Sequence, residues 1–311
     1  MEEVARILVV GSINMDMVVR SPHMPAPGET VLGDGFATSP GGKGANQAVA
    51  AARLGAKCSL LGRVGKDAFG QTLLAGLLAE GIDCTNVMVT DGAASGVAMI
   101  IVDSRGENSI VVASGANYLL TPDDVFSRED VFKQADAVVL QLELPLPTVR
   151  AAIEVAKRND CMVILDPAPM PKCLAQTICE VDVITPNVTE AEMLTGTRTG
   201  EEKADMNIAM DLIARGAKAA VLKLGSRGSM VVTADGQMAR VAAYNVDIVD
   251  TTAAGDAFTA ALAFYVAQGG QLIAAAKFAN AAGALACTRL GAQSAMPTRD
   301  EVRILMQDQP Q

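Results

Sequence analysis

The sequence predicts an α/β fold: a three-layer α/β/α sandwich with a mostly parallel central sheet, plus a small β-sheet that forms a lid. From residue 135 onward, short apolar runs alternate with helix-length segments, which is typical of parallel strands joined by helices. Before that point lie strand-like segments at about 15–38, which contains a stretch rich in Pro and Gly, and at 97–113, which contains a turn at 103–106. We expect these to form the lid, within a single domain spanning residues 1–311.

The strands expected in the central sheet are short apolar runs, and several are followed by Gly or Pro. They are Arg6–Val10, Cys58–Gly62, Ala137–Leu140, Met162–Leu165, Val181–Ile184 and Ala219–Leu222. Such runs are typical of strands buried on both faces. The expected helices are 45–54, 147–158, 188–195, 203–215, 254–268 and 271–286. In the lid, β-prone pieces such as Glu29–Leu32 are expected to contribute strand.

Composition excludes several classes of protein. Half of the 311 residues are hydrophobic but only 3% are aromatic, so the core must be built from aliphatic side chains. The net charge of −10 argues against binding to nucleic acid or to an anionic membrane, because phosphate groups are bound by clustered Lys and Arg. No apolar run reaches the roughly 18 residues of a membrane span, and the first residues lack signal-peptide character. We therefore expect a cytoplasmic protein.

The cysteines and the single histidine restrict the chemistry further. No two cysteines form a C-x-x-C pair, so all six are expected to be reduced thiols: Cys58, Cys84, Cys161, Cys173, Cys179 and Cys287. His23 is the only histidine, and it lies in a Pro-rich segment. A site with several histidine ligands is therefore impossible. Acid–base chemistry must come from carboxylates, Lys or Cys.

The strongest candidate for chemistry is Asp250–Asp256, with the sequence Asp-Thr-Thr-Ala-Ala-Gly-Asp just before an apolar helix. The first N–H groups of a helix are unpaired, and small residues let an anion approach them. Ala253, Ala254 and Gly255 therefore form a candidate anion hole. Within it, Asp256 suits a general base that takes a proton from an attacking hydroxyl. The alternative is that Asp256 only caps the helix.

Two segments carry polar groups that could hold a ligand. Gly41–Asn46 is a Gly-rich turn into a helix that does not match the P-loop pattern, and it offers Lys43 and Asn46. Asn14 and Asp16 follow the first strand, and side chains two apart on an extended segment point the same way. This pair suits recognition of neighbouring hydroxyls. A structural turn remains an alternative for the first segment, and an Asx turn for the second.

Two further segments suit a nucleotide or a metal ion. Asn187 and Glu190 share one face at a helix start, where they could organise Mg²⁺ through water or form a capping box, and both roles can hold at once. Leu224–Gly228 is a tight glycine turn after a predicted strand. Taken alone, this turn is only weak support for nucleotide binding.

Taken together, these segments resemble the ribokinase-like family of sugar and nucleoside kinases over nearly the whole chain. The Gly41–Asn46 and Asp250–Asp256 blocks are the most specific, and all motifs fall in the family's order and spacing. The resemblance implies ATP-dependent phosphorylation of D-ribose at its 5-hydroxyl. It implies that Asp256 is the catalytic base, and that Ala253, Ala254 and Gly255 form the anion hole.

The resemblance also implies binding roles for individual residues. The implied sugar-binding residues are Asn14, Asp16, Gly42, Lys43, Asn46, Glu143 and Asp256. The implied ATP-binding residues are Asn187, Lys223, Leu224, Gly225, Ser226, Arg227, Gly228, Gly255, Asp256 and Asn280. The family's lids cover the sugar and pair between subunits, so a homodimer is expected.

Metal sites follow from the same resemblance. Asn187 and Glu190 match the positions tied to Mg²⁺, which they would hold through water. A potassium site is implied at Asp250, Thr252, Ala286, Arg289, Gly291 and Ala295, with most ligands being backbone carbonyls.

The chain departs from the family's pattern at three positions. Lys223 stands where many members have Thr; it could reach a phosphate or simply end its strand. Ala295 stands where a Ser hydroxyl often completes the cation shell, and the adjacent Ser294 could substitute for it. Ala253 replaces a Gly that is common in the wider family.

Three other functions were weighed against ribose phosphorylation. A kinase of 2-deoxyribose is not distinguished by the residues. A nucleoside kinase would need room for a base, usually lined by aromatics, and the aromatic-poor lid argues against it. A catalytically silent sugar-binding regulator would have no need to retain Asp256 and the anion hole.

Overall fold

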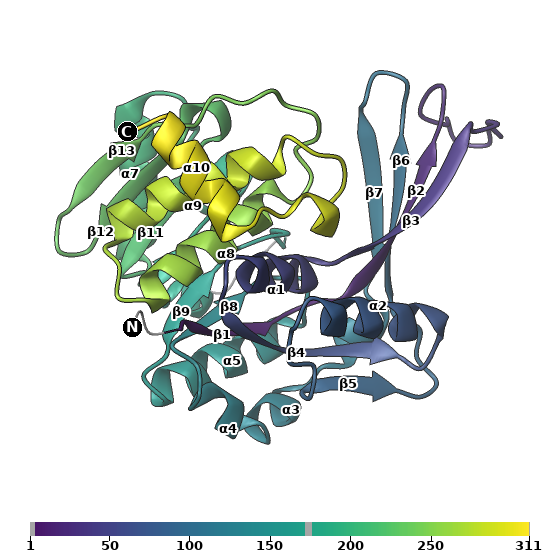
Figure 1. Ribbon diagram of the computed structural model, residues 1–311, viewed down its shortest axis with the longest axis horizontal. Coiled ribbons are helices and arrows are strands. Elements are labelled where there is room, and N and C mark those ends of the chain that lie inside the picture. Colours follow the sequence, from purple (N-terminus) through teal and green to yellow (C-terminus); the bar gives the residue numbers. More distant parts are fainter. Residues whose placement is uncertain (1–3, 172–175, 311) are drawn as a thin grey trace.

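The computed structural model describes residues 4–171 and 176–310, and its larger sheet has nine strands (Figure 1). Their order is β13-β12-β11-β10-β9-β8-β1-β4-β5. Strands from β11 to β5 are parallel, whereas β12 and β13 form an antiparallel edge. The bounds are β1 Arg6–Val10, β4 Lys57–Gly65, β5 Val87–Thr90, β8 Ala137–Leu140, β9 Met162–Leu165, β10 Val183–Ile184, β11 Ala219–Lys223, β12 Ser229–Thr233 and β13 Met238–Val241.

Helices cover both faces of this sheet, because its strands are apolar on both sides. In β1, Ile7 and Val9 pack into one hydrophobic cluster while Leu8 and Val10 pack into the other. On the first side lie α1 Lys43–Arg53, α2 Ala68–Ala79, α8 Ala254–Ala267, α9 Leu272–Ala286 and α10 Arg299–Asp308. On the second lie α3 Pro122–Phe126, α4 Glu129–Phe132, α5 Leu146–Arg158, α6 Val188–Thr195 and α7 Glu202–Ala214. The predicted three-layer fold is confirmed.

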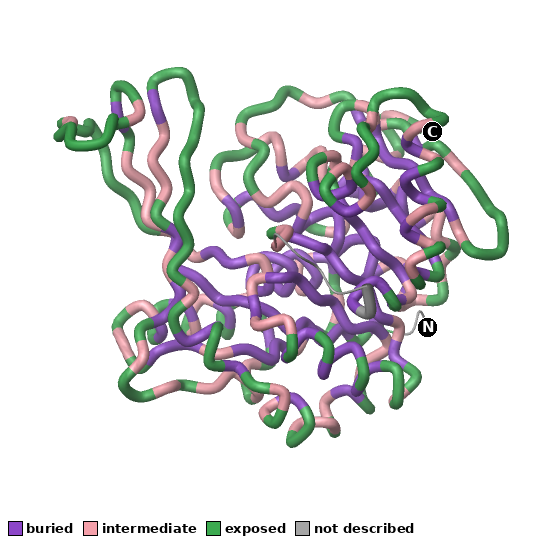
Figure 2. The backbone as a smooth tube through the Cα atoms, turned by 180° about the vertical axis from the view of Figure 1, so that it is seen from behind, coloured by how far each residue is buried: buried purple, intermediate pink, exposed green. Residues whose placement is uncertain are grey.

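The second sheet has four strands in the order β3-β2-β6-β7 and is hereafter the small sheet. Its strands are β2 Asn14–Arg20, β3 Gly35–Gly41, β6 Gly96–Val102 and β7 Asn108–Ala113. It projects from the main body, and most of it is exposed or half-buried (Figure 2). Exposed apolar side chains on it include Phe36, Ile110 and Val111. The predicted second sheet is therefore present.

One predicted piece of the small sheet is wrong. Glu29–Leu32 lies in the loop between β2 and β3, and strand β3 begins only at Gly35. The Glu29 carboxylate accepts hydrogen bonds from the backbone N–H of Ala26 and from His23, which closes a local turn. Leu32 is 89% exposed, so its β-prone side chain has nothing to pack against.

Other elements match the predictions or add to them. The predicted helices of the C-terminal half agree with the structure to within two residues, whereas β10 covers only the last two residues of its predicted strand. Helix α10 and the β12–β13 edge were not predicted. The five described cysteines are free thiols, while Cys173 lies outside the described residues. In the part of the chain that the structure describes, no helix has the length and hydropathy needed to cross a bilayer.

Candidate active site

A cavity of about 690 Å³ opens at the carboxyl ends of the parallel strands, which is where open α/β sheets bind ligands. The N-terminus of α8 lines it. Its lining includes Lys43, Asp166, Asn187, Glu190, Lys223, Gly225, Ser226, Gly228, Thr251, Ala253, Ala254, Gly255, Asp256, Asn280 and Cys287. The structure thus brings together most of the predicted nucleotide and anion-hole residues.

Helix α8 begins without a side-chain cap. Its N-cap is Ala253, which has φ 58° and ψ 11°. This left-handed conformation costs a non-glycine residue roughly 1 kcal/mol. Asp256 occupies the third helical position, and its carboxylate does not cap the helix. The capping alternative is therefore wrong, and the N-terminus of α8 is left open to an anion.

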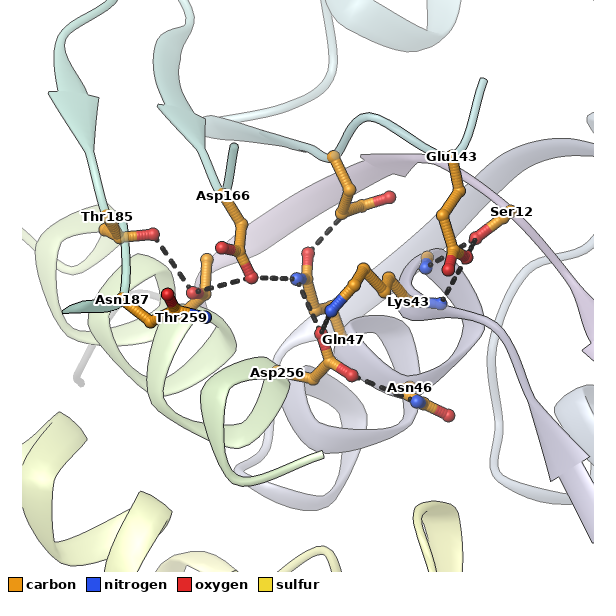
Figure 3. A network of polar contacts seen from close by, with 12 residues as sticks. Ser12, Lys43, Asn46, Gln47, Glu143, Asp166, Thr185, Asn187, Asp256 and Thr259 are labelled. Atoms are coloured by element: carbon orange, nitrogen blue, oxygen red, sulfur yellow. Dashed lines mark hydrogen bonds and ion pairs between the residues drawn. The ribbon is translucent and has the colours of Figure 1, made fainter. Parts of the chain in front are cut away.

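The Asp256 carboxylate is instead held by two amides from α1 (Figure 3). Asn46 Nδ2 donates to Oδ2 at 3.0 Å, and Gln47 Nε2 donates to Oδ1 at 3.0 Å. The Lys43 ammonium lies 4.0 Å from Oδ1. Three side chains of one helix turn therefore fix the orientation of this buried acid.

Burial and charge together set the protonation of this centre. Burial raises the pKa of Asp256, as does the charge of Asp166, while Lys43 opposes both. For Lys43 the balance is reversed: burial lowers its pKa, but the charges of Asp256 and the neighbouring acids outweigh burial and raise it. Lys43 is therefore a cation, and Asp256 is a stronger base than an exposed aspartate.

A second group of polar side chains gathers beyond Lys43, around Glu143. Glu143 Oε2 accepts from the Ser12 hydroxyl, from Asn14 Nδ2 at 3.4 Å and from the Lys43 N–H at 3.1 Å. Burial, followed by the charges of Glu143 and Asp256, raises the pKa of Asp16 to about 7. Of the predicted sugar-binding residues, Lys43 and Asp256 line the large cavity, whereas the lining does not include Asn14, Asp16, Gly42, Asn46 or Glu143.

Close backbone approach makes this cluster possible. Gly42 has φ 87°, a conformation that other residues rarely adopt. A Cβ on Gly41 would lie 2.2 Å from the Asp16 carboxylate. The carbonyl Oδ1 of Asn46 is buried with no hydrogen-bond partner among the described residues. A ligand hydroxyl beside Asn46 would satisfy it.

The predicted nucleotide residues divide into two groups. Asn187 and Glu190 form a capping box at α6, and both line the cavity. Asn280 also lines it, and its amide donates to the Ala242 carbonyl at 2.9 Å. By contrast, Leu224 is buried in the core, and the Arg227 guanidinium binds Asp205 and the Gly200 carbonyl. The structure does not bring these last two side chains to the cavity.

The predicted potassium residues lie where two loops meet beside α8. Asp250 accepts from the Thr252 N–H at 2.9 Å, from the Thr252 hydroxyl at 2.6 Å and from the Gly291 N–H at 2.9 Å. Burial raises the pKa of Asp250, but these hydrogen bonds outweigh burial and lower it. Ala286, the last residue of α9, and Ala295 are both fully buried.

Two side chains near these loops are engaged elsewhere. Arg289 forms an ion pair with Glu301, and the Ser294 hydroxyl donates to the Leu290 carbonyl at 2.9 Å. Residue 295 thus offers no hydroxyl, and the hydroxyl of Ser294 is oriented by the Leu290 carbonyl. Across residues 4–171 and 176–310, no three His, Cys, Asp or Glu side chains are grouped to hold a metal ion.

Sequence reasoning missed several residues of the site. Gln47 directly follows the predicted Gly41–Asn46 block, and Asp166 directly follows strand β9 at the ligand-binding edge. Glu143, which the family resemblance supplied, also follows a strand at this edge, so a search for acids after strand ends could have found Asp166. Asn117 binds Asn14 Oδ1 at 2.8 Å and the backbone of Ile13. No sequence pattern places Asn117 beside Asn14.

Comparison with known proteins defines the class. The chain belongs to the pfkB family of carbohydrate kinases, whose model matches residues 4–299. It is 39% identical over 295 residues to a ribokinase of Haemophilus influenzae, covering 95% of this chain and 96% of that one. It is 38% identical over 296 residues to a deoxyribokinase of Salmonella typhi, covering 95% and 96%. A structure of Arabidopsis thaliana ribokinase complexed with ribose and ATP superposes with a TM-score of 0.90 at 32% identity, covering 97% and 99%.

The raised pKa of Asp16 predicts a pH effect on stability. Between its ordinary pKa of 3.8 and about pH 7, Asp16 is protonated when folded but ionised when unfolded. Folding then binds a proton, so the free energy of unfolding falls as pH rises through this window, by up to about 1.4 kcal/mol per pH unit. We expect Asp16→Asn to flatten the fall in Tm between pH 5 and 7.

Asp34→Asn, a change at an exposed site on the same hairpin, is the matched control and should retain the slope of the unaltered protein. Thermal unfolding of the ligand-free proteins in buffers of constant ionic strength measures both. Identical slopes for the unaltered protein and Asp16→Asn would contradict the assignment.

Proposed function

We propose that this protein transfers the γ-phosphoryl group of ATP to the 5-hydroxyl of D-ribose. The observation that carries the proposal is the buried Asp256 carboxylate, held between Asn46 and Gln47 at the uncapped N-terminus of α8. A base set among unpaired helix amides suits a hydroxyl that loses a proton while it attacks an anion. The relatives named ribokinase support ribose as the acceptor.

The chemistry follows from this placement. Asp256 accepts the proton of the sugar hydroxyl as the new oxygen–phosphorus bond forms. The bond between the γ-phosphorus and the bridging oxygen breaks, and ADP leaves. The N–H groups at Gly255 and Asp256, with the positive end of the α8 dipole, stabilise the charge on the transferring group. The Ala254 N–H already donates to the Thr251 carbonyl at 3.3 Å. The raised pKa of Asp256 favours proton acceptance.

Sugar recognition is assigned to the cluster around Glu143. Asn14, Asp16 and Glu143 offer carboxylate and amide groups suited to hydroxyl groups. The unpaired Asn46 Oδ1 provides one more acceptor. Lys43 neutralises part of the negative charge where three acids meet, since Asp256, Asp166 and Glu143 all act on it.

ATP is assigned to the cavity, with its phosphates at α8. Gly225, Ser226, Gly228 and Asn280 line the far part of the cavity. Asn187 and Glu190 offer oxygen ligands of the kind that Mg²⁺ prefers, and binding through water suits an ion that usually keeps several of its own waters. When bound, Mg²⁺ would neutralise charge on the phosphate oxygens of ATP.

Three further assignments complete the proposal. The small sheet acts as a lid that excludes water from the sugar. The chain forms one catalytic domain over residues 1–311. It works in the cytoplasm without nucleic acid or membrane, in keeping with its net charge of −10.

A coupled assay of ATP consumption tests the function. We expect D-ribose to be the best acceptor in a panel of pentoses, 2-deoxyribose, hexoses and nucleosides, with Mg²⁺ required. Asp256→Asn should lower kcat by about three or more orders of magnitude yet keep ribose and ATP binding, because only the base is lost. Asp300→Asn, at the start of α10, is the control.

Other outcomes would contradict the proposed function or the role of Asp256. A preference for 2-deoxyribose would make the chain a deoxyribose kinase, like its Salmonella relative. Sugar binding without ATP consumption would indicate a silent sugar-binding protein. Near-normal kcat in Asp256→Asn would remove the base assignment.

Potassium is proposed as an activator beside α8. The Asp250 carboxylate joins the loops at Thr252 and Gly291, and carboxylate and carbonyl oxygens suit a hard cation. We expect a higher kcat, and a higher Tm before substrate is added, in potassium chloride than in tetramethylammonium chloride at equal ionic strength. Asp250→Ala should abolish both differences. Equal rates and equal Tm values in the two salts would exclude the site.

A symmetric homodimer is proposed through the small sheet. Its edge strand β7 is exposed along its length, and an exposed apolar edge needs cover. We expect sedimentation to give about twice the chain mass of 32.1 kDa. Val111→Lys should shift the protein toward monomer, whereas the exposed Met193→Lys on α6 should not. A monomer at all concentrations would refute this assembly.

A further inference from the structure

Lys223 and Asp166 form an ion pair inside the cavity. Lys223 ends strand β11 and Asp166 follows β9, and Nζ lies 2.7 Å from Oδ1. The side chains are 11% and 1% exposed. Both residues line the cavity with Gly255 and Asp256. The pair therefore stands at the end of the sheet where the phosphates of ATP are assigned.

Stability alone does not explain a buried pair of this kind. Desolvation of both charges offsets most of their attraction, and apolar replacements of similar size are often neutral or stabilising. Removing one partner is costly, because it strands the other charge. A pair that faces a cavity is better placed to bind a charged ligand.

The Lys223 ammonium has room for another acceptor. It offers three N–H donors. One binds Asp166, and a second lies 3.5 Å from the Thr259 hydroxyl. A Cβ built on Gly255 would lie 3.4 Å from Nζ. The ammonium thus stands directly beside the uncapped first turn of α8.

Asp166 also connects this cation to the base. Its Oδ2 accepts from Gln47 Nε2 at 3.1 Å, and the same amide nitrogen donates to Asp256 at 3.0 Å (Figure 3). Gln141 holds the other end of the Gln47 amide at 2.6 Å. Asp166 is therefore fixed by the same amide that fixes Asp256, and it sets the position of Nζ relative to the base.

We propose that Lys223 is a catalytic residue that binds the transferring phosphoryl group, and that Asp166 is its positioning residue. This rests on the proposed function, in which the phosphoryl group passes between Asp256 and the first turn of α8. The ammonium adds a full positive charge to the partial charge of the helix amides. A fixed charge at this place stabilises the group in transfer without reorganisation.

Other acids near Lys223 explain why its ammonium must be held by Asp166. Burial raises the pKa of both Asp256 and Glu190, and the charge of Lys223 opposes burial at each. A free ammonium could therefore pair with either acid and block the base or the nucleotide. Asp166 keeps Lys223 at one place between them.

The main test variant leaves no stranded charge. Lys223→Thr with Asp166→Asn replaces the ion pair by a neutral pair. Lys223→Gln alone removes the charge but keeps a donor for Asp166, and it serves if the double variant does not fold. The matched control is Lys218→Thr with Asp182→Asn, an ion pair of the same 2.7 Å separation at the amino end of β11.

Calorimetric titration with ATP, ADP and AMP measures how much Lys223 contributes to binding the terminal phosphoryl group. If Lys223 binds the terminal phosphoryl group, the double variant should lose about tenfold or more in ATP affinity and less than about twofold in AMP affinity. Its kcat should fall about 100-fold with the sugar KM unchanged. The control pair should behave like the unaltered protein.

Asp166→Asn separates positioning from contact. Lys223 remains but is no longer held by a charge, so kcat should fall about tenfold while ATP affinity changes less than about threefold. Equal losses in kcat and affinity would make Asp166 a structural residue and contradict its assigned role.

Two outcomes would overturn the assignment of Lys223. One is a double variant whose kcat and ATP affinity stay within twofold of the unaltered protein. The other is an equal loss of affinity for ATP, ADP and AMP, which would mean a damaged cleft. Nucleotide binding requires no sugar, so these results decide the role of Lys223 even if ribose proves not to be the acceptor.

Discussion

The site depends on one contact, the meeting of α1 and α8 through the Asp256 carboxylate. Asn46 and Gln47 reach this acid from α1, and its position at the third residue of α8 places it among unpaired backbone donors. A buried carboxylate needs such partners, because desolvation without them would neutralise it. The Gly-rich turn before α1 and the left-handed Ala253 before α8 both serve this one junction.

Acidic and basic side chains lie next to one another around this junction. Asp166 lies between Gln47 and Lys223, and Lys43 lies near Asp256 on the side of Glu143. Both lysines line the same cavity as the base. Asp256 and Asp166 each lie near a lysine, whereas burial and the charges of Glu143 and Asp256 raise the pKa of Asp16 to about 7.

The sequence was informative where a pattern is local. Apolar runs located β1, β8 and β9 to the residue, and the motif blocks located Asp256 and Lys43, because backbone conformation and spacing are short-range. The partners of these residues were not found, since Gln47, Asp166 and Asn117 act through contacts between distant segments. The strand predicted at Glu29–Leu32 was wrong for the same reason. A β-prone segment forms a strand only where another strand can pair with it, and this loop has no such neighbour.

The small sheet is joined to the body by the residues assigned to the sugar. Strand β2 begins at Asn14, β3 ends at Gly41, and β6 begins at Gly96, whose Cβ would collide with the Asn14 amide. The hinge and the sugar cluster are thus one structure. Under the proposed sugar assignment, a tilt of the sheet would move Asn14 and Asp16, so acceptor affinity and sheet orientation would bias each other by the same factor.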